Sequence, residues 1–181
     1  SELEQEQGLE TSAFVAAEWA ATPRLLVAGG LRVVLYQFLG PKTVFDYENT
    51  SSPSLIETVG STNFSNGEAI ETYSGIEPRI SARYKLNTTS SIKAGYSRTN
   101  QFINQIFNSD SPTPTSQWQL STNYIEPVRS HNFSLGFFKN FQNDDWQTSA
   151  EVYYRDVDAL FAYKDFADIT VNPQLDTELL T

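Results

Sequence analysis

The chain has 181 residues, a formal net charge of −10 and a pI near 4.5, and it contains no Cys and no Met. The acidic balance argues against a nucleic-acid partner, because phosphate binding rests on clustered Lys and Arg. The absence of Cys excludes disulfides and thiolate metal sites within this chain. The chain contains no run of about 18 apolar residues, so no transmembrane helix is predicted. A transmembrane strand is not excluded, because it carries a much weaker, alternating signal.

Alternation of apolar and polar residues predicts three β-hairpins, over residues 13–36, 79–98 and 129–155. Their turns fall at 22–23, 87–90 and 142–145 and are only a few residues long, as in tight hairpins. Successive side chains of a strand point to opposite faces. In the third hairpin Val152 and Tyr154 share one parity, whereas Glu151 and Arg155 share the other. The six predicted strands therefore have one apolar and one polar face each.

The connections between the hairpins are long. The chain from about 39 to 75 is rich in Ser, Thr, Asn and Gly, that from about 100 to 128 is rich in Ser, Thr and Asn, and a third outer segment covers 156–178. Connections of this length are uncommon in compact soluble domains. Short turns at one end and long loops at the other are typical of outer-membrane barrels. The predicted fold is all-β: an antiparallel up-and-down transmembrane barrel, present as a partial barrel of about six strands with long extracellular loops.

Several Lys and Arg side chains lie on the polar face of the predicted strands, which indicates that this face contacts water. Burying them in a protein core would be costly unless each charge were paired, whereas a water-filled lumen or a polar plug accepts them. The candidate lumen-facing residues are Arg83, Lys85, Lys93, Glu151 and Arg155. The apolar parity, including Ala82 and Val152, would then meet lipid, with Trp19, Phe141 and Trp146 as a girdle near the short turns.

One irregularity breaks the alternation, at Phe137-Phe138 followed by Lys139. A β-bulge would account for it, and so would Lys139 extending toward a membrane interface.

The single histidine and the aromatic residues of the outer segments are the remaining candidates for ligand binding or catalysis. His131 is the only histidine and is expected at a barrel rim or in the lumen rather than in a metal site or a triad. No nucleophile stands beside a base, so neither an enzyme nor a cofactor is predicted. Phe102, Trp118 and Tyr124 are candidate ligand contacts in the outer segments, the alternative being that they pack the loops.

Several segments together resemble one family. They are IEPRISARY (76–84), SIKAGYSR (91–98), PTSQW (114–118), IEP (125–127), LGFFKNF (135–141) and EVYYR (151–155). In their order and spacing they resemble the C-terminal half of the barrel of TonB-dependent outer-membrane receptors, of the type that often carries a carboxypeptidase-regulatory-like domain.

The resemblance implies a barrel of about 22 strands in the bacterial outer membrane. A plug domain would close it, and TonB would drive import of a scarce ligand of the siderophore, vitamin or glycan/peptide class. No plug, TonB box or signal peptide is recognisable here, so residues 1–181 are expected to be a fragment of the barrel domain. Its partners would be outer-membrane lipid, the rest of the barrel and plug, the TonB complex, and a small-molecule or oligomeric ligand.

Two alternatives remain open. The same barrel without energy coupling would be a passive porin or a surface adhesin. Strands with one apolar face also build soluble β-sandwich binding modules.

Overall fold

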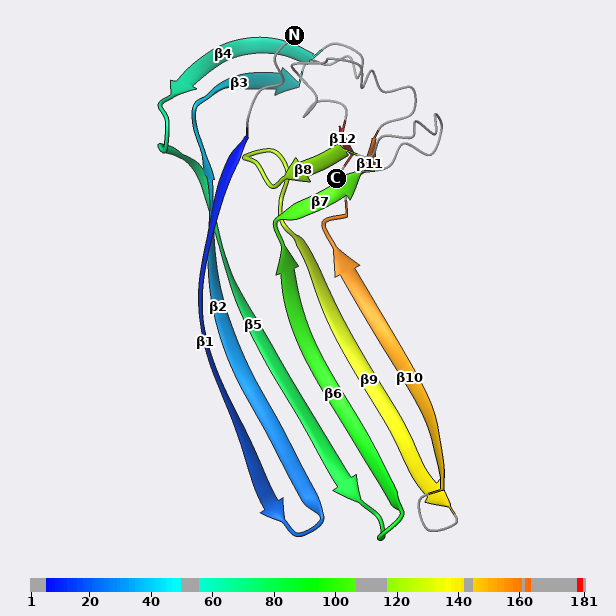
Figure 1. The fold of residues 1–181 in the computed structure, drawn as a ribbon. Helices are drawn as coiled ribbons and strands as arrows, with labels where there is room; N and C mark the ends of the chain where they lie inside the picture. Colours follow the sequence, from blue (N-terminus) through cyan, green and yellow to red (C-terminus); the bar gives the residue numbers. More distant parts are fainter. Residues whose placement is uncertain are drawn as a thin grey trace.

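The computed structural model describes residues 6–49, 56–106, 117–141, 145–160, 162–163 and 179–180. These residues form strands and no helix, and none of them belongs to a helix that could span a membrane. The main sheet has six antiparallel strands in the order β1-β2-β5-β6-β9-β10, which lie side by side in Figure 1. Their bounds are β1 Gln7–Thr22, β2 Leu25–Leu39, β5 Ala69–Lys85, β6 Ser90–Gln101, β9 Val128–Phe141 and β10 Trp146–Asp158.

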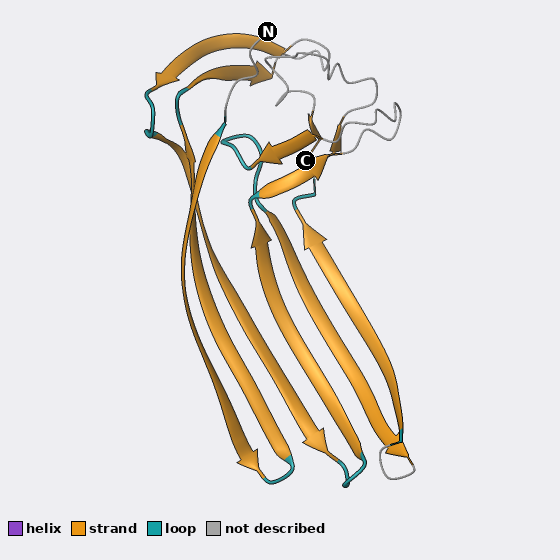
Figure 2. Ribbon diagram, in the orientation of Figure 1, coloured by secondary structure: helices purple, strands orange, loops and turns teal. Residues whose placement is uncertain are grey.

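The three predicted hairpins are confirmed as β1-β2, β5-β6 and β9-β10. Short connections join the partners of each hairpin at one end of the sheet, and the described parts of the long connections lie at the other end (Figure 2). We call these the short-turn end and the loop end. The strands are longer than the predicted ones, and β5 begins at Ala69, so residues 69–75 belong to a strand and not to the preceding connection.

The long connections contain further strands that the alternation did not predict. β3 (Lys42–Asn49) pairs with β4 (Ile56–Phe64), β7 (Ile103–Ile106) with β8 (Gln117–Leu120), and β11 (Ala162–Tyr163) with β12 (Leu179–Leu180). At the turn between β4 and β5, Gly67 has a φ of +77°, a conformation that glycine adopts without a steric cost. The described parts of the connections therefore contain antiparallel strand pairs of their own.

The register of the main sheet groups side chains into rows that cross all six strands. Directly paired residues share a face, so each row has one environment. One row is apolar throughout and consists of Trp19, Val27, Ala82, Ala94, Leu135 and Val152. A second row on this face consists of Ala17, Gly29, Ile80, Tyr96, Phe133 and Tyr154. We call this side the apolar face; its large side chains are mostly exposed, Trp19 to 68% and Val152 to 66%.

The opposite side, which we call the polar face, alternates with it residue by residue. One of its rows consists of Leu26, Arg83, Lys93, Gly136 and Glu151. A row nearer the loop end consists of Ala16, Gly30, Arg79, Ser97, Asn132 and Arg155. Charged and small residues therefore share this face.

The apolar band runs obliquely across the rows. On β1, β2 and β5 it extends toward the loop end as far as the paired residues Ala13, Val33 and Ile76. On β6, β9 and β10 it ends earlier, at the row of Arg98, His131 and Asp156. Strands of a membrane barrel tilt by about 35–45°, so a band parallel to the membrane must cut the rows at an angle.

The irregular stretch of β9 contains no bulge. Its pairing with β6 and with β10 is continuous from Gly136 to Lys139. Phe138 therefore lies on the polar face, opposite Ser91, and Lys139 lies on the apolar face with its Nζ 4.7 Å from the ring centre of Phe141. The prediction of a bulge is wrong. Lys139 extends over the ring of Phe141, close to the short-turn end.

The buried core lies on the polar face at the loop end. It consists of Val34, Tyr36, Phe38 and Phe102, with Ile70, Tyr73 and Leu120 packed against it. The rest of the main sheet has no second layer among the described residues, so both of its faces are largely exposed (Figure 1).

Candidate functional site: the polar face of the sheet

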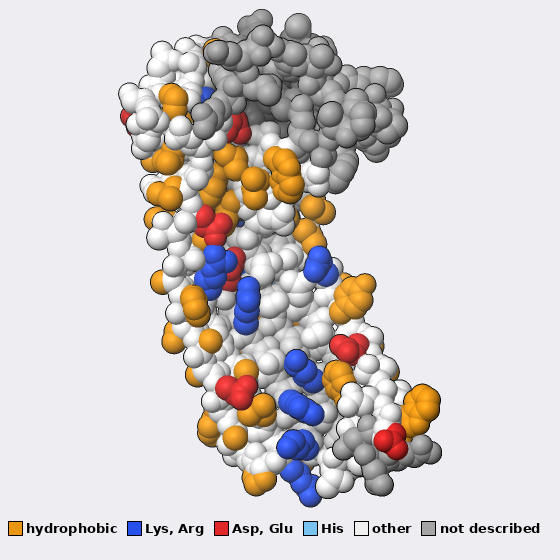
Figure 3. Space-filling view, viewed as in Figure 1, with side chains coloured by type: hydrophobic (Ala, Val, Ile, Leu, Met, Phe, Trp, Pro, Cys, Tyr) orange, Lys and Arg blue, Asp and Glu red, His pale blue; other side chains and the backbone are white. Residues whose placement is uncertain are grey.

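Basic side chains follow β5 on the polar face. Arg79, Arg83 and Lys85 have the same parity, and Lys93 of β6 stands directly opposite Arg83. Figure 3 shows a column of Lys and Arg side chains along the short-turn half of the face that it views. Within the described part of the chain, none of these four residues forms a salt bridge. Their charges are therefore not neutralised by acidic side chains of the described residues.

The structure places all five predicted lumen-facing residues on this one face. Arg83, Lys93 and Glu151 occupy a single row, Lys85 lies two residues nearer the short turns, and Arg155 lies in the row of Arg79. The Arg155 Nε donates to Asn132 Oδ1 at 2.7 Å. The five residues therefore share one face of the sheet.

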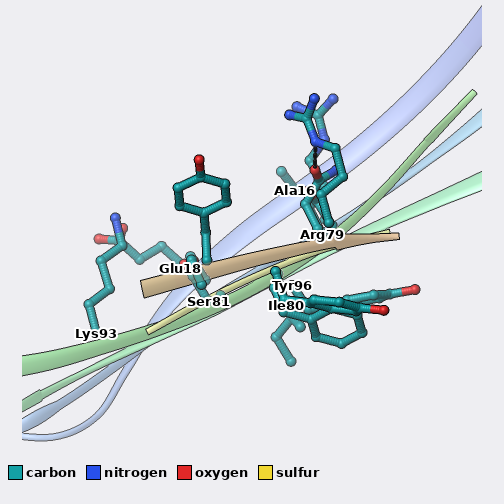
Figure 4. A pocket seen from close by; sticks show the side chains of 18 of the residues that line it. Ala16, Glu18, Arg79, Ile80, Ser81, Lys93 and Tyr96 are labelled. Atoms are coloured by element: carbon teal, nitrogen blue, oxygen red, sulfur yellow. Dashed lines mark hydrogen bonds between the residues drawn. The ribbon is translucent and has the colours of Figure 1, made fainter. Parts of the chain in front are cut away.

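A shallow trough of about 950 Å³ crosses the middle of the sheet, where the rows contain many small residues. Ser81, which lies between Arg79 and Arg83 on this face of β5, is opposite Gly95 of β6. Figure 4 shows Glu18, Arg79 and Lys93 pointing to one side of the sheet, with Ile80 and Tyr96 on the other. The close-up thus shows the same division of faces as the register.

A buried carboxylate, which sequence reasoning missed, lies where β6 departs from β5. The two strands pair directly only from Arg79 to Lys85 of β5. Just beyond, Glu77 is 1% exposed and accepts hydrogen bonds from the backbone N of Asn100 at 2.7 Å and from Asn100 Nδ2 at 3.2 Å. Arg32 Nη1 lies 3.2 Å from Glu77 Oε2, and Arg32 Nη2 lies 2.5 Å from Glu10 Oε1. Glu77 therefore joins β2, β5 and β6 where the direct β5–β6 pairing ends.

Contacts of aromatic residues, one ring stack and two tyrosine hydrogen bonds, hold the loops against the polar face at the loop end. Phe102 stacks on Tyr36 with ring centres 4.7 Å apart and planes 7° apart. The Tyr73 hydroxyl donates to the carbonyl oxygen of Thr122 at 2.7 Å, and the Tyr124 hydroxyl donates to the carbonyl oxygen of Phe45. A barrel strand crosses a bilayer with about 9–11 residues counted from the short turns, so Tyr36 and Tyr73 lie beyond that span. Burial raises the pKa of both to about 12, which keeps their hydroxyls protonated.

Comparison with known proteins agrees with this architecture. The sequence profile of a family described as TonB dependent receptor-like, beta-barrel, matches residues 4–176. The chain belongs to this TonB-dependent receptor barrel family. Among solved structures, the one named copper transporter OprC matches with a TM-score of 0.52 and 18% sequence identity. The match covers 87% of this chain and 22% of that one, so the chain spans about a fifth of its length. No curated protein matches the chain significantly.

The predicted ligand contacts of this receptor barrel lie in different surroundings. Phe102 is 5% exposed within the core, so in this conformation its ring packs the loops. Tyr124 is 36% exposed and holds the contact to Phe45. Trp118 on β8 is 63% exposed and, of the three, presents most surface to a ligand. The signal that could have separated them is position, because Phe102 directly follows a long strand whereas Trp118 lies further along the loop.

The single histidine lies on the apolar face of the receptor barrel. His131 is paired with Arg98 and Asp156, and its Nδ1 is 3.0 Å from the Tyr96 hydroxyl. It marks the loop-end boundary of the apolar band on β9, on the face opposite to that of Arg83 and Lys93. Among the described residues no group of three or more His, Cys, Asp or Glu side chains could hold a metal ion.

Proposed function

We propose that residues 1–181 form part of the barrel domain of a bacterial outer-membrane receptor that imports a scarce ligand by TonB-coupled transport. The observation that carries the proposal is the pair of rows of apolar and aromatic residues that cross all six strands next to rows of charged and small residues. Family membership supports it, since the matching profile is that of TonB-dependent receptor barrels.

The apolar face suits a lipid environment. Its large apolar side chains are exposed. Exposing them costs free energy in water, whereas in a bilayer it does not. Trp19, Phe141 and Trp146 are exposed near the short turns, where a periplasmic girdle would lie. The long connections would then face the outside of the cell.

The polar face suits the interior of a wide barrel. Arg79, Arg83, Lys85 and Lys93 remain solvated there, and a plug domain and TonB would supply closure and energy from outside this stretch. The ligand would be a small molecule or an oligomer of the siderophore, vitamin or glycan/peptide class, recognised at the loop end, where Trp118 is exposed.

Copper is not proposed as the ligand. At 18% identity the likeness to the copper transporter concerns the fold alone.

The test uses the complete receptor in living cells. Uptake of a panel of labelled ferric siderophores, cobalamin and oligosaccharides is measured with and without TonB, and with and without a protonophore. We expect uptake of one class that disappears in both treatments. Uptake that survives both would contradict energy coupling and favour a passive porin. Extraction of the native protein into buffer without detergent would contradict every membrane function and favour a soluble β-sandwich module.

A further inference from the structure

The pairing of β5 with β6 stops short of the loop end. β5 begins at Ala69 and β6 ends at Gln101, but the two strands pair only as far as Arg79 and Ser97. Beyond that pair β5 is bonded to β2, and β6 is bonded to β9. The sheet therefore divides toward the loop end into β1-β2-β5 and β6-β9-β10, and the two groups diverge in Figure 1. We call this division the seam.

Pro78 lies at the start of the seam. Proline has no backbone N–H to donate to a neighbouring strand, and within sheets it is confined to edge strands, strand starts and bulges. At Pro78 the strand β5 still pairs with Leu31 of β2 but no longer with β6. Beyond this residue, no ladder of backbone hydrogen bonds holds β6 to β5, so the place of β6 depends on side chains.

The Glu77 side chain supplies a link across the seam. It is 1% exposed, and its Oε1 accepts hydrogen bonds from the backbone N of Asn100 at 2.7 Å and from Asn100 Nδ2 at 3.2 Å. Its second oxygen, Oε2, is held by Arg32 Nη1 of β2 at 3.2 Å. Hydrogen bonds to an ionised acceptor are stronger than those between neutral groups. Glu77 thus fastens the end of β6 to a strand with which β6 no longer pairs.

The backbone of β5 leaves room for this link at Gly75. A Cβ atom at this position would lie 2.5 Å from Asn100 Nδ2 and 3.2 Å from Val34 Cγ1. The bare glycine therefore lets the Asn100 amide lie against β5 beside Glu77. An alanine there would displace the amide, which is the free end of a side chain, and would leave the contact between Glu77 and Arg32 in place.

The end of β6 leads directly into the exposed part of the following connection. Phe102 stacks on Tyr36, and its carbonyl oxygen accepts a hydrogen bond from Ser121 N at 2.8 Å. The next residues form β7, which pairs with β8 and places Trp118 opposite Gln105. Trp118 is 63% exposed. The position of this ring therefore depends on where β6 ends.

We propose that Glu77 is a positioning residue for ligand recognition. By holding Asn100 against β5, it sets the place from which the β7-β8 pair presents Trp118 to a ligand. Glu77 itself is buried and acts through Asn100, without contact to the ligand. This proposal rests on the proposed function in one respect, that Trp118 meets the ligand at the loop end.

The structural test measures a distance across the seam in the complete receptor. Its cysteines are replaced, and nitroxide labels are attached at Val15 on β1 and Ile103 on β7, which are 68% and 47% exposed. Double electron–electron resonance in lipid vesicles gives the distance distribution. We expect one narrow distribution for the parent, which Glu77→Ala broadens and shifts. Glu10→Ala is the matched control, since it removes an acid from Arg32 but leaves the Asn100 contact.

Two further variants separate positioning from a general loss of stability. Glu77→Gln keeps a carbonyl oxygen for the Asn100 N–H, so its distribution should stay close to that of the parent. Gly75→Ala displaces Asn100 without touching the Glu77 carboxylate, so it should broaden the distribution although less than Glu77→Ala does. Gly75→Ala also serves if the Glu77→Ala receptor does not assemble.

The functional test measures uptake of the labelled ferric siderophores, cobalamin and oligosaccharides by the same variants. For a compound that the parent imports, Glu77→Ala should raise the half-saturating concentration roughly fivefold or more and keep the maximal rate per assembled receptor within about twofold. Trp118→Ala should raise it as well. Because Glu77 acts through the placement of Trp118, the double variant should resemble Trp118→Ala, so the two effects should not add.

Two outcomes overturn the proposal. The first is an unchanged distance distribution for a Glu77→Ala receptor whose assembly is shown by heat-modifiable gel mobility. The second is an unchanged half-saturating concentration, or effects of Glu77→Ala and Trp118→Ala that add fully. If none of the compounds is imported, the proposed function fails, but the distances are measured without TonB or ligand and still decide whether Glu77 positions the β7-β8 pair.

Discussion

Two neighbouring rows of the sheet, one residue apart along each strand, differ completely in character. The row through Ala82 and Leu135 is apolar on all six strands, whereas the row through Arg83 and Lys93 carries three charged residues and a glycine. The backbone and the strands are the same for both rows. We therefore expect the two faces to lie in different environments. The parity of a residue, more than the strand it belongs to, should determine how a substitution there affects stability.

The largest effect should come from a charge placed on the apolar face. Ala82→Arg or Val152→Arg should destabilise the assembled barrel by roughly 2–4 kcal/mol near the bilayer midplane. Ser81→Arg, one residue away on the polar face, is the control and should fold almost normally. Urea-dependent folding into lipid vesicles, followed by heat-modifiable mobility, measures both, and equal folding of the three variants would break the comparison.

The next effect should come from the buried carboxylate of the polar face. Glu77→Ala leaves Asn100 and the Nη1 group of Arg32 without the acceptor that Glu77 supplies and should cost about 1–3 kcal/mol. Glu10→Ala removes an ion pair to the same arginine, but the Glu10 side chain is 43% exposed, so about 0.2–1 kcal/mol is expected. Urea unfolding midpoints compare them; a Glu10 effect as large as that of Glu77 would count against the Glu77 contacts.

A smaller effect should follow from loosening the loops above the polar face. Tyr73→Phe removes the hydrogen bond to Thr122 and should cost about 0.5–1.5 kcal/mol. Hydrogen exchange in residues 121–127 should become faster while the strands stay protected. Tyr153→Phe, a change at an 84% exposed tyrosine, is the control and should leave exchange unchanged.

The smallest effect on assembly should come from reversing charges on the polar face. Arg83→Glu or Lys93→Glu should change stability by less than about 0.5 kcal/mol, because both side chains are exposed. Ligand uptake by the complete receptor should change more than assembly does. Loss of folding with either variant would show that the polar face is packed in a way the row pattern does not describe.

The sequence allowed the long strands and the identity of each face to be predicted, because strict alternation over many residues leaves one choice of parity. It did not reveal β3 and β4, which carry no continuous apolar stripe although Val44 and Phe45 have high β-propensity, or β7 and β8, which are only four residues long each. These strands are held by pairing and by loop contacts such as that of Tyr124 with Phe45.

The candidate site was predictable to the same degree. Parity alone was enough to group Arg83, Lys85 and Lys93 on one face. The Glu77 network was not predictable, because its members come from β1, β2, β5 and β6 and meet only through the register. The side of the sheet on which Phe138 lies was also not predicted. Two consecutive phenylalanines suggested a bulge, whereas the uninterrupted pairing of β9 with β6 places one ring on each face.

The most direct test of the face assignment is a scan of β10 from residue 149 to 155 in the complete receptor. Cysteine is introduced one position at a time, labelled with a nitroxide and measured in lipid vesicles for collision with oxygen and with a water-soluble nickel complex. Oxygen accessibility should be high at Ala150, Val152 and Tyr154, and nickel accessibility at Ser149, Glu151 and Arg155. The reverse order, or no alternation, would contradict the assignment of the apolar face to lipid.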